Sequence, residues 1–414
     1  MKRSDFEIMA PAGSSESLAA AIQGGADSVY FGIDQLNMRA GSANNFTISD
    51  LPAITALCGG KGIRTYLTLN VVVYDREMNQ MREIVDASVK AGVSAIIASD
   101  MAVIDYAARA GAEVHLSTQV NITNSEALRF YASFADVIVL ARELNLDQVR
   151  IIYDYIRKNN IRGPSGRLIQ IEMFIHGALC MAVSGKCYLS LHESNTSANR
   201  GTCYQTCRKA YVVTEKETGH ELEIDNEYIM SPKDLCTIGF LNKIADAGVS
   251  VMKIEGRARS AEYVRTVTEC YNEALNAIIG GTYTDEEIEV WRARLATVFN
   301  RGFWDGYYLG QRLGEWTSRY GSSATMTKVY LGRVTNYFAK IGVAEIKLEN
   351  GDLKTGDNLL ITGPSTGAME FTAGEIRVDL RPVEKALKGE MCSIPVLTPV
   401  RRSDKVYHRV ESGR

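Results

Sequence analysis

Residues 7–32 read EIMAPAGSSESLAAAIQGGADSVYFG, and the order of their apolar and small residues decides the fold class. A short apolar run opens the stretch, and a helix-like sequence follows at 15–24, with Leu18 and Ile22 on one face. A pair of glycines stops that helix, and a second apolar run follows at 28–32. This order predicts a strand, a helix and a return to the next strand, which is the unit of a parallel sheet.

The same unit recurs along the first 260 residues of the chain. Eight short apolar runs alternate with helix-like stretches, at 7–10, 28–32, 65–70, 95–99, 114–118, 137–140, 169–175 and 251–255. Gly25, Gly92 and Gly248 each stand just before one of these runs, as expected where a helix returns to a strand. Eight parallel strands close a (β/α)8 barrel, so we predict an α/β protein with this TIM-like fold. An open doubly wound sheet is the alternative, because the same alternation allows it.

Two departures from the alternation define the predicted domains. An insertion of about 70 residues, 176–247, separates the seventh and eighth runs, and a hairpin is predicted inside it at 211–224. A small polar stretch at 319–323 resembles a linker, and six short alternating runs follow it. We therefore predict a barrel domain at 1–320 that carries the cysteine-bearing insertion, and a small C-terminal antiparallel β-barrel domain at 325–414.

The composition of the 414 residues excludes several classes of protein. With 46% apolar and 23% charged residues, the chain is not a disordered protein, a collagen or a coiled coil. It has no apolar run of about 20 residues and no signal-peptide pattern, so we expect a cytoplasmic protein with no membrane partner. A net charge of −3 gives no general attraction to nucleic acid, so an RNA partner needs a local basic patch.

Four of the eight cysteines lie close together in the sequence, at Cys180, Cys187, Cys203 and Cys207. Four thiolates that a loop brings together form the donor set of a soft metal site. An iron–sulfur cluster, a structural zinc ion and four unconnected thiols remain open, although spacers of 6, 15 and 3 residues match no common zinc module. Cys236 could replace one of the four, and the dispersed cysteines are expected to be core residues.

The sequence around these cysteines contains contiguous motifs. EMFIHGALC at 172–180 precedes GKCYLS at 185–190, and NRGTC follows at 199–203. Together with APAGS at 10–14 and KIEGR at 253–257, these motifs resemble the collagenase-like proteins of the unassigned-type peptidase family U32. The resemblance extends over most of the first 260 residues, and the rest of the chain has a similar layout.

Within that family, the chain is similar to the branch that hydroxylates tRNA. The resemblance implies a 4Fe-4S cluster on the four neighbouring cysteines, and prephenate rather than dioxygen as the hydroxyl donor. It also implies conversion of the wobble uridine of tRNA to 5-hydroxyuridine. Related members hydroxylate 23S rRNA or serve oxygen-independent ubiquinone synthesis. These alternatives stay open, because Lys209 stands where the tRNA branch commonly has an aromatic residue.

In a (β/α)8 barrel, the reacting groups lie at the carboxyl ends of the strands. The predicted catalytic residues there are His176, Lys253, Glu255 and Arg257. His176 is either a general acid–base or a structural histidine. The other three alternate along one run, so they share a face that lines a polar cavity or pairs with Arg142 and Glu143. The predicted substrate-binding residues are Arg39, Asn70, Gln119, Arg142 and Glu143. A cationic side chain at this end of the barrel would suit a dicarboxylate such as prephenate.

The insertion also carries features suited to RNA. Lys186, Arg200 and Arg208 are basic, and Tyr188 and Tyr204 could stack on an unpaired base. The leading hypothesis is therefore a tRNA-modifying enzyme whose partners are tRNA and a small-molecule hydroxyl donor. A peptidase is the second hypothesis, although the sequence has no HExxH motif and no recognisable nucleophile–His–Asp set among its five histidines. A non-catalytic iron–sulfur scaffold is the third.

Overall fold

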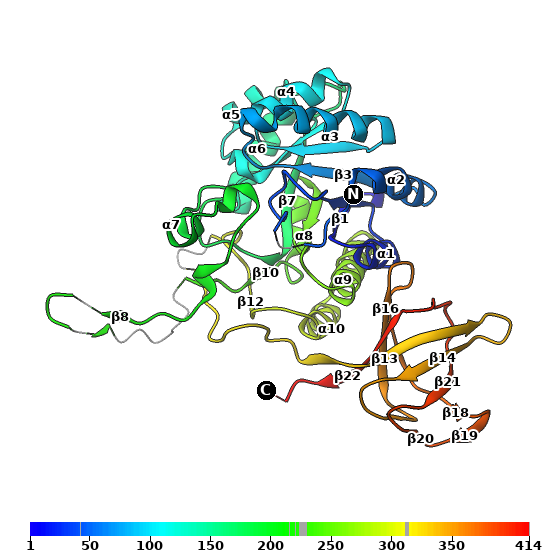
Figure 1. The fold of residues 1–414 in the computed structure, drawn as a ribbon. Helices are drawn as coiled ribbons and strands as arrows, with labels where there is room; N and C mark the ends of the chain where they lie inside the picture. Colours follow the sequence, from blue (N-terminus) through cyan, green and yellow to red (C-terminus); the bar gives the residue numbers. More distant parts are fainter. Residues whose placement is uncertain (42, 215, 220, 223–229, 311–313, 414) are drawn as a thin grey trace.

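The computed structural model describes residues 1–41, 43–214, 216–219, 221–222, 230–310 and 314–413, and its N-terminal part is a closed barrel (Figure 1). The eight barrel strands are β1 (Glu7–Ala12), β2 (Ser28–Phe31), β3 (Arg64–Leu69), β4 (Ala95–Ala98), β5 (Val114–Leu116), β6 (Val137–Val139), β7 (Gln170–Ala178) and β11 (Val249–Ile254). They pair in parallel in the order β11-β1-β2-β3-β4-β5-β6-β7, and β11 also pairs with β7. That last pairing closes the ring, so the (β/α)8 prediction is confirmed and the open sheet is excluded.

Helices cover the outside of the barrel. They are α1 (Ser15–Gln23), α2 (Leu51–Gly59), α3 (Met78–Ala91), α4 (Met101–Arg109), α5 (Ser125–Tyr131), α6 (Leu146–Lys158), α8 (Leu241–Asp246), α9 (Ala261–Gly280) and α10 (Asp285–Ala296). Ser14 and Asn145 cap α1 and α6, because each side chain accepts a hydrogen bond from a backbone N–H of the first turn. Gly25, Gly92 and Gly248 have φ angles of 77°, 75° and 95°, the left-handed conformation that glycine favours, so the three predicted returns are confirmed.

The excursion between the seventh and eighth barrel strands is shorter than predicted. β7 runs through His176 to Ala178, so the chain leaves the barrel three residues later than predicted. At the other end, β10 (Asp234–Cys236) pairs antiparallel with β7, and α8 is a helix of the barrel wall. The excursion therefore spans residues 179–233, which we call the cysteine segment.

The cysteine segment has little regular structure. It contains α7 (Leu189–Ser194) and two single 3-10 turns, Ala198–Arg200 and Thr206–Arg208. The predicted hairpin is confirmed where β8 (Val213–Thr214) pairs antiparallel with β9 (Glu221–Leu222); the predicted strand residues 223 and 224 lie outside the described residues. In Figure 1 this hairpin extends away from the barrel.

The C-terminal part is antiparallel, as predicted. Its eight-stranded sheet contains β13 (Met326–Phe338), β14 (Val343–Leu348), β16 (Asn358–Gly363), β17 (Gly367–Thr372), β18 (Ile376–Val378), β19 (Arg381–Val383), β21 (Met391–Pro395) and β22 (Lys405–Glu411). The hydrogen-bonded order is β17-β16-β22-β13-β14-β21-β18-β19, and β15 (Leu353–Lys354) pairs separately with β20 (Lys385–Ala386). Two predicted runs merge into β13, whereas β17 and β22 were not predicted. The sheet encloses its own apolar core, including Leu331, Ile346 and Ile361.

The C-terminal sheet packs against the barrel through β17. The Gln23 amide of α1 donates to the carbonyl of Thr366 at 2.7 Å and accepts from the backbone N–H of Ala368 at 3.1 Å. The contact is close, because a Cβ added at Gly367 would lie 2.3 Å from Gln23 Oε1. Among the described residues, no helix is both long enough and apolar enough to cross a membrane.

Candidate functional site

A cavity of about 210 Å³ opens at the carboxyl ends of the barrel strands. Its barrel side includes Tyr30 of β2, Thr68 of β3 and Lys253 of β11. The cysteine segment forms the opposite side. This is the end at which (β/α)8 enzymes hold their reacting groups, so the cavity is the candidate active site.

The four predicted metal ligands, Cys180, Cys187, Cys203 and Cys207, all line this cavity. Cys180 is exposed, and the other three are half-buried. Burial raises the pKa of the Cys207 thiol, Arg208 lowers it, and the negative charges of the other three thiolates raise it further. The four thiols therefore lie near enough to one another for their charges to interact.

The four thiols fit a soft metal group by their chemistry, because four sulfur donors are the ligand set of zinc sites and of iron–sulfur clusters. In the described part of the chain, however, no three His, Cys, Asp or Glu side chains are grouped closely enough to hold a single metal ion.

The other four cysteines are core residues, as predicted. Cys58, Cys236, Cys270 and Cys392 are all buried. Burial raises the pKa of Cys58 and Cys236 to about 11, and that of Cys270 and Cys392 to about 12. Cys236 does not line the cavity and lies 3.9 Å from the Tyr271 hydroxyl, so it does not replace one of the four neighbouring thiols.

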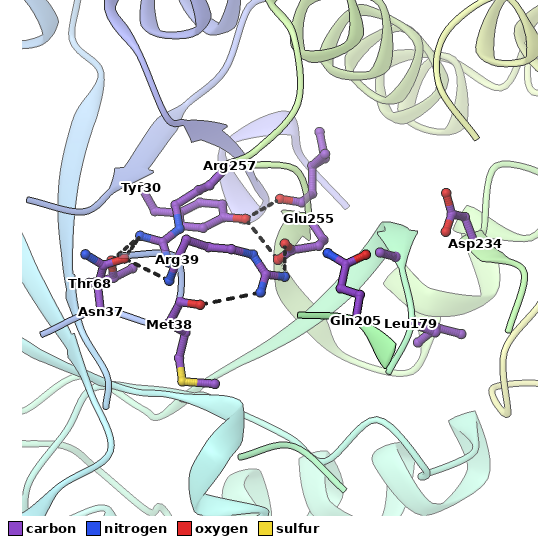
Figure 2. Close-up of polar contacts among 12 residues, drawn as sticks. Tyr30, Asn37, Met38, Arg39, Thr68, Leu179, Gln205, Asp234, Glu255 and Arg257 are labelled. Atoms are coloured by element: carbon purple, nitrogen blue, oxygen red, sulfur yellow. Dashed lines mark hydrogen bonds and ion pairs between the residues drawn. The ribbon is translucent and has the colours of Figure 1, made fainter. Parts of the chain in front are cut away.

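Arg39 and Glu255 form an ion pair on the barrel side of the cavity (Figure 2). Arg39 Nη2 donates to Glu255 Oε1 at 2.8 Å, and the Tyr30 hydroxyl lies 3.5 Å from the second carboxylate oxygen. Burial alone would raise the pKa of Glu255, but Arg39 and two further arginines outweigh it and lower that pKa to about 2. Attraction to Glu255 also holds the pKa of Arg39 above its usual value. Glu255 is therefore a carboxylate at neutral pH, not a proton donor.

Lys253 is paired with a carboxylate that the sequence did not nominate. Its Nζ lies 2.7 Å from Glu172 Oε1, and the two side chains are 6% and 0% exposed. The ammonium group also lies 4.6 Å from the centre of the Tyr30 ring. Charges so deeply buried persist because each has an opposite partner. Glu172 was detectable as a lone carboxylate within an apolar strand, but the sequence did not indicate its partner.

Arg257 is held by neutral groups and is 4% exposed. Its Nη1 donates to Asn37 Oδ1 at 3.0 Å and to Thr68 Oγ1 at 2.7 Å (Figure 2). Burial lowers the pKa of Arg257 to about 10, so the side chain remains a cation at neutral pH. Gly32 leaves the space for it, because a Cβ at that position would lie 2.5 Å from Arg257 Nη1.

Lys253, Glu255 and Arg257 do line one cavity, but in a different way from the prediction. β11 ends at Ile254, so Glu255 and Arg257 lie in the loop that follows the strand. Of the two predicted alternatives, the cavity lining is confirmed; the ion pairs of Lys253 and Glu255 are with Glu172 and Arg39, whereas Arg142 acts on Glu255 only through its charge.

His176 does not reach the cavity, so its predicted catalytic role is corrected. The residue is 1% exposed, and its Nδ1 lies 3.3 Å from the Tyr271 hydroxyl. The rings of Tyr263, Tyr271 and Phe303 surround it. Burial, assisted by the charge of Arg259, lowers the pKa of His176 to about 3, so the imidazole stays neutral. It is the structural histidine that the sequence left as an alternative.

Four of the five predicted substrate-binding residues line the cavity: Arg39, Asn70, Gln119 and Arg142. Asn70 Nδ2 lies 3.4 Å from Gln119 Oε1. The Arg142 guanidinium lies 4.1 Å from the centre of the Phe174 ring, and its buried Nε has no hydrogen-bond partner among the described residues. Glu143 is exposed and lines a neighbouring pocket, so the prediction for that residue is corrected.

Three further arginines line the cavity; Arg208 was predicted only as part of a basic patch for RNA, and Arg259 and Arg301 were not identified from the sequence. Arg208 is 9% exposed, and its guanidinium donates to the carbonyls of Leu179 and Pro232. Arg259 lies 3.6 Å above the Phe299 ring, and Arg301 pairs with an aspartate of β10. Arg259 continues the alternation of Lys253, Glu255 and Arg257 by one step, a signal that could have identified it.

Positive charge dominates the cavity. Its lining contains seven arginine or lysine side chains and one acidic side chain. Four of these cations, Arg142, Arg208, Arg257 and Arg259, have no ion-pair partner among the described residues. An excess of cations behind low-dielectric walls attracts an anionic ligand.

These features define a class: a (β/α)8-barrel protein with a cationic cavity at the barrel mouth and four cysteines across it. The chain belongs to peptidase family U32, whose family model matches residues 13–318. This agrees with the resemblance seen in its motifs.

Three relatives illustrate the range of the family. A protein of Porphyromonas gingivalis named collagenase is 62% identical over 98% of both chains. The tRNA hydroxylation protein P1 of Bacillus subtilis is 31% identical over 86% of this chain and 83% of that one. A 23S rRNA 5-hydroxycytidine synthase of Escherichia coli is 34% identical over 66% of this chain and 40% of that one. Some homologues are thus named as RNA-hydroxylating proteins, and another is named as a collagenase.

Proposed function

We propose that this protein is an RNA hydroxylase that holds an iron–sulfur cluster on its four neighbouring cysteines. The specific reaction we propose is conversion of the wobble uridine of tRNA to 5-hydroxyuridine, with prephenate as hydroxyl donor. The observation that carries the proposal is the cationic cavity at the barrel mouth, bordered by four thiols. The similarity to RNA-hydroxylating proteins supports the choice of RNA as the substrate.

The unpaired cations are suited to the donor. Prephenate carries two carboxylates, and guanidinium groups bind carboxylates through paired, charge-assisted hydrogen bonds. Arg142 and Arg257 line the cavity without a carboxylate partner among the described residues, as Arg208 and Arg259 also do. We assign Arg142 and Arg257 to the carboxylates of the donor. The charge of Arg39 is neutralised by Glu255, so Arg39 forms part of the cavity wall rather than a carboxylate-binding group.

Cys180, Cys187, Cys203 and Cys207 would hold the cluster. We propose a cluster rather than zinc because the spacers of 6, 15 and 3 residues match no common zinc module, whereas iron–sulfur clusters are held by cysteines at varied spacings. When bound, a 4Fe-4S cluster on four cysteines would supply a centre that exchanges one electron.

The protein side chains bind and orient the two substrates, and they exclude water from the cavity. Arg257 is fixed by Asn37 and Thr68, so a carboxylate meets a preorganised cation. Glu255 remains ionised and His176 is buried away from the cavity, so neither residue serves as a general acid there. Tyr188 and Tyr204 are 75% and 57% exposed on the cysteine segment, and they offer faces on which RNA bases can stack.

A nucleoside analysis tests this function. Deleting the gene should remove 5-hydroxyuridine and its derivatives from tRNA, as measured by mass spectrometry of digested tRNA, and the wild-type gene should restore them. A variant with Arg257→Met should restore less than a tenth as much. Unchanged nucleosides in both tRNA and 23S rRNA of the deletion strain would overturn the proposal, whereas a loss confined to 23S rRNA would correct the substrate.

Proteolysis is the second candidate, because a 62% identical relative is named collagenase. The described residues offer it little support. None of the four described histidines is hydrogen-bonded to a described serine or cysteine, and the sequence has no HExxH motif. The test is release of peptides from gelatin by the purified protein. If the protein releases peptides and no cavity substitution abolishes this activity, a peptidase site elsewhere is favoured.

A further inference from the structure

A second pocket of about 290 Å³ adjoins the cationic cavity and differs from it in composition. Trp304, Tyr307 and Trp316 line it. Among the described residues of its lining, the charged ones are Arg142 and Glu143, one of each sign. The pocket therefore suits a flat and neutral group rather than an anion.

The two compartments share a wall. The residues common to both are Arg142, Leu179, Cys180, Met181, Ala182 and Ser184. This wall contains one of the four neighbouring cysteines and the arginine whose Nε lacks a partner among the described residues. A group bound in the aromatic pocket would consequently lie next to a ligand bound in the cavity.

The aromatic side chains are held in place by the backbone around them. Trp316 forms a backbone bridge with Pro232, at the end of the cysteine segment. The rings of Trp304 and Tyr307 meet edge to face, with centroids 5.3 Å apart. A Cβ added at Gly314 would lie 3.5 Å from the Trp316 ring and 3.6 Å from the Tyr307 hydroxyl, so both side chains converge on this glycine.

Trp304 adds a polar feature to the pocket wall. The residue is 5% exposed, and its indole Nε1–H has no hydrogen-bond partner among the described residues. Buried donors without a partner are rare in folded proteins, because they have given up water without a replacement. A carbonyl oxygen of a bound ligand would satisfy this donor after a small rearrangement of the wall.

We propose that this pocket binds an unpaired base of the RNA substrate, an inference that rests on the proposed function. Proteins recognise single-stranded RNA by turning bases out of the strand and stacking them on aromatic rings. A pyrimidine is flat and neutral, and its carbonyls accept hydrogen bonds. Glu143 at the rim can accept a hydrogen bond from an N–H of the base. The cationic cavity next door then remains free for the anionic donor.

Binding of a short RNA hairpin with a uridine-containing loop tests the pocket. Affinity is measured by anisotropy of the labelled RNA, and stacking is measured by quenching of tryptophan emission. Trp316→Ala should weaken binding about tenfold or more, the range expected for the loss of one stacked base. Trp316→Phe should keep most of the affinity and lose part of the quenching. Phe130→Ala removes a 63% exposed aromatic of α5 outside the pocket and should change neither.

The outcomes separate this inference from the proposed function. If Trp316→Ala binds the RNA with wild-type affinity and Trp316→Phe shows full quenching, the base does not bind in this pocket, although the protein still binds RNA. If Trp316→Ala does not fold, Trp316→Phe and Tyr307→Ala still decide the question by the same two readouts. Absence of binding of the hairpin to the wild-type protein would overturn both the RNA hydroxylase function and the base pocket.

Discussion

The barrel rim and the cysteine segment face each other across one cavity, but they are held in place by different means. On the rim, Lys253 and Arg257 are 5% and 4% exposed, and each is bound to partners from other strands or loops. In the cysteine segment, Tyr188 and Tyr204 are mostly exposed, and the regular structure of its described residues is one short helix, single turns and a hairpin of two two-residue strands. The rim is thus fixed by its own packing, whereas the proposed metal group would give the segment a cross-link through its thiols.

The largest expected effect follows from removing that cross-link. Cys203→Ala should lower the iron content of anaerobically purified protein to a small fraction of the wild-type value, because three thiols hold a four-ligand cluster poorly. Limited proteolysis should then cleave the cysteine segment faster while the barrel stays resistant. Cys392→Ala, in the C-terminal core, is the matched control and should keep its iron. Full retention of iron by Cys203→Ala would exclude Cys203 as a ligand.

The next largest effect should come from the buried pair of the rim. Glu172→Gln leaves the Lys253 ammonium without an opposite charge in a site where both side chains are almost fully buried. We expect a loss of about 3 kcal/mol in the free energy of unfolding, measured by urea denaturation. If the unfolding free energy of Glu172→Gln lies within about 1 kcal/mol of the wild-type value, this pair does not fix the rim.

The pair of Arg39 and Glu255 should give the rim a pH dependence. The pKa of Glu255 is lowered from 4.5 to about 2, so its stabilisation is present above pH 4.5 and is lost as the pH falls towards 2. The difference in unfolding free energy between wild type and Glu255→Gln should be about 3 kcal/mol at neutral pH and should shrink below pH 4.5. A difference that does not change with pH would show that the Glu255 charge contributes nothing to stability.

The smallest effect is expected at an ion pair on the surface of the cysteine segment. Lys209 and Glu193 lie 3.1 Å apart with both side chains about half exposed. Glu193→Gln should change the unfolding free energy by less than about 0.5 kcal/mol, because water and salt screen such pairs. A loss as large as that of Glu172→Gln would contradict the contrast between the two regions.

The barrel was predictable because its signal is local and repeated. Each apolar run and each glycine return lies within a few residues of sequence, and their number gives the closed ring. The close spacing of the four cysteines and the hairpin at 211–224 were predictable for the same reason.

Partners across the barrel were not predictable. Glu172 lies 81 residues from Lys253 in the sequence, and Arg39 lies 216 residues from Glu255. Which strands become neighbours is known only once the ring closes, so local sequence patterns cannot assign such pairs. The catalytic role predicted for His176 was wrong for a related reason. β7 ends two residues beyond His176, and the His176 side chain packs towards α9.

Arg208 ties the two ends of the cysteine segment together. Its guanidinium donates to the carbonyl of Leu179, where the segment starts, and to the Ser231 hydroxyl and the Pro232 carbonyl, where it ends. A loop fastened at its base can lengthen, shorten or change sequence at its tip without disturbing the strands that carry it. The β8–β9 hairpin is such a tip, so changes there would leave the cavity lining at the base of the segment in place.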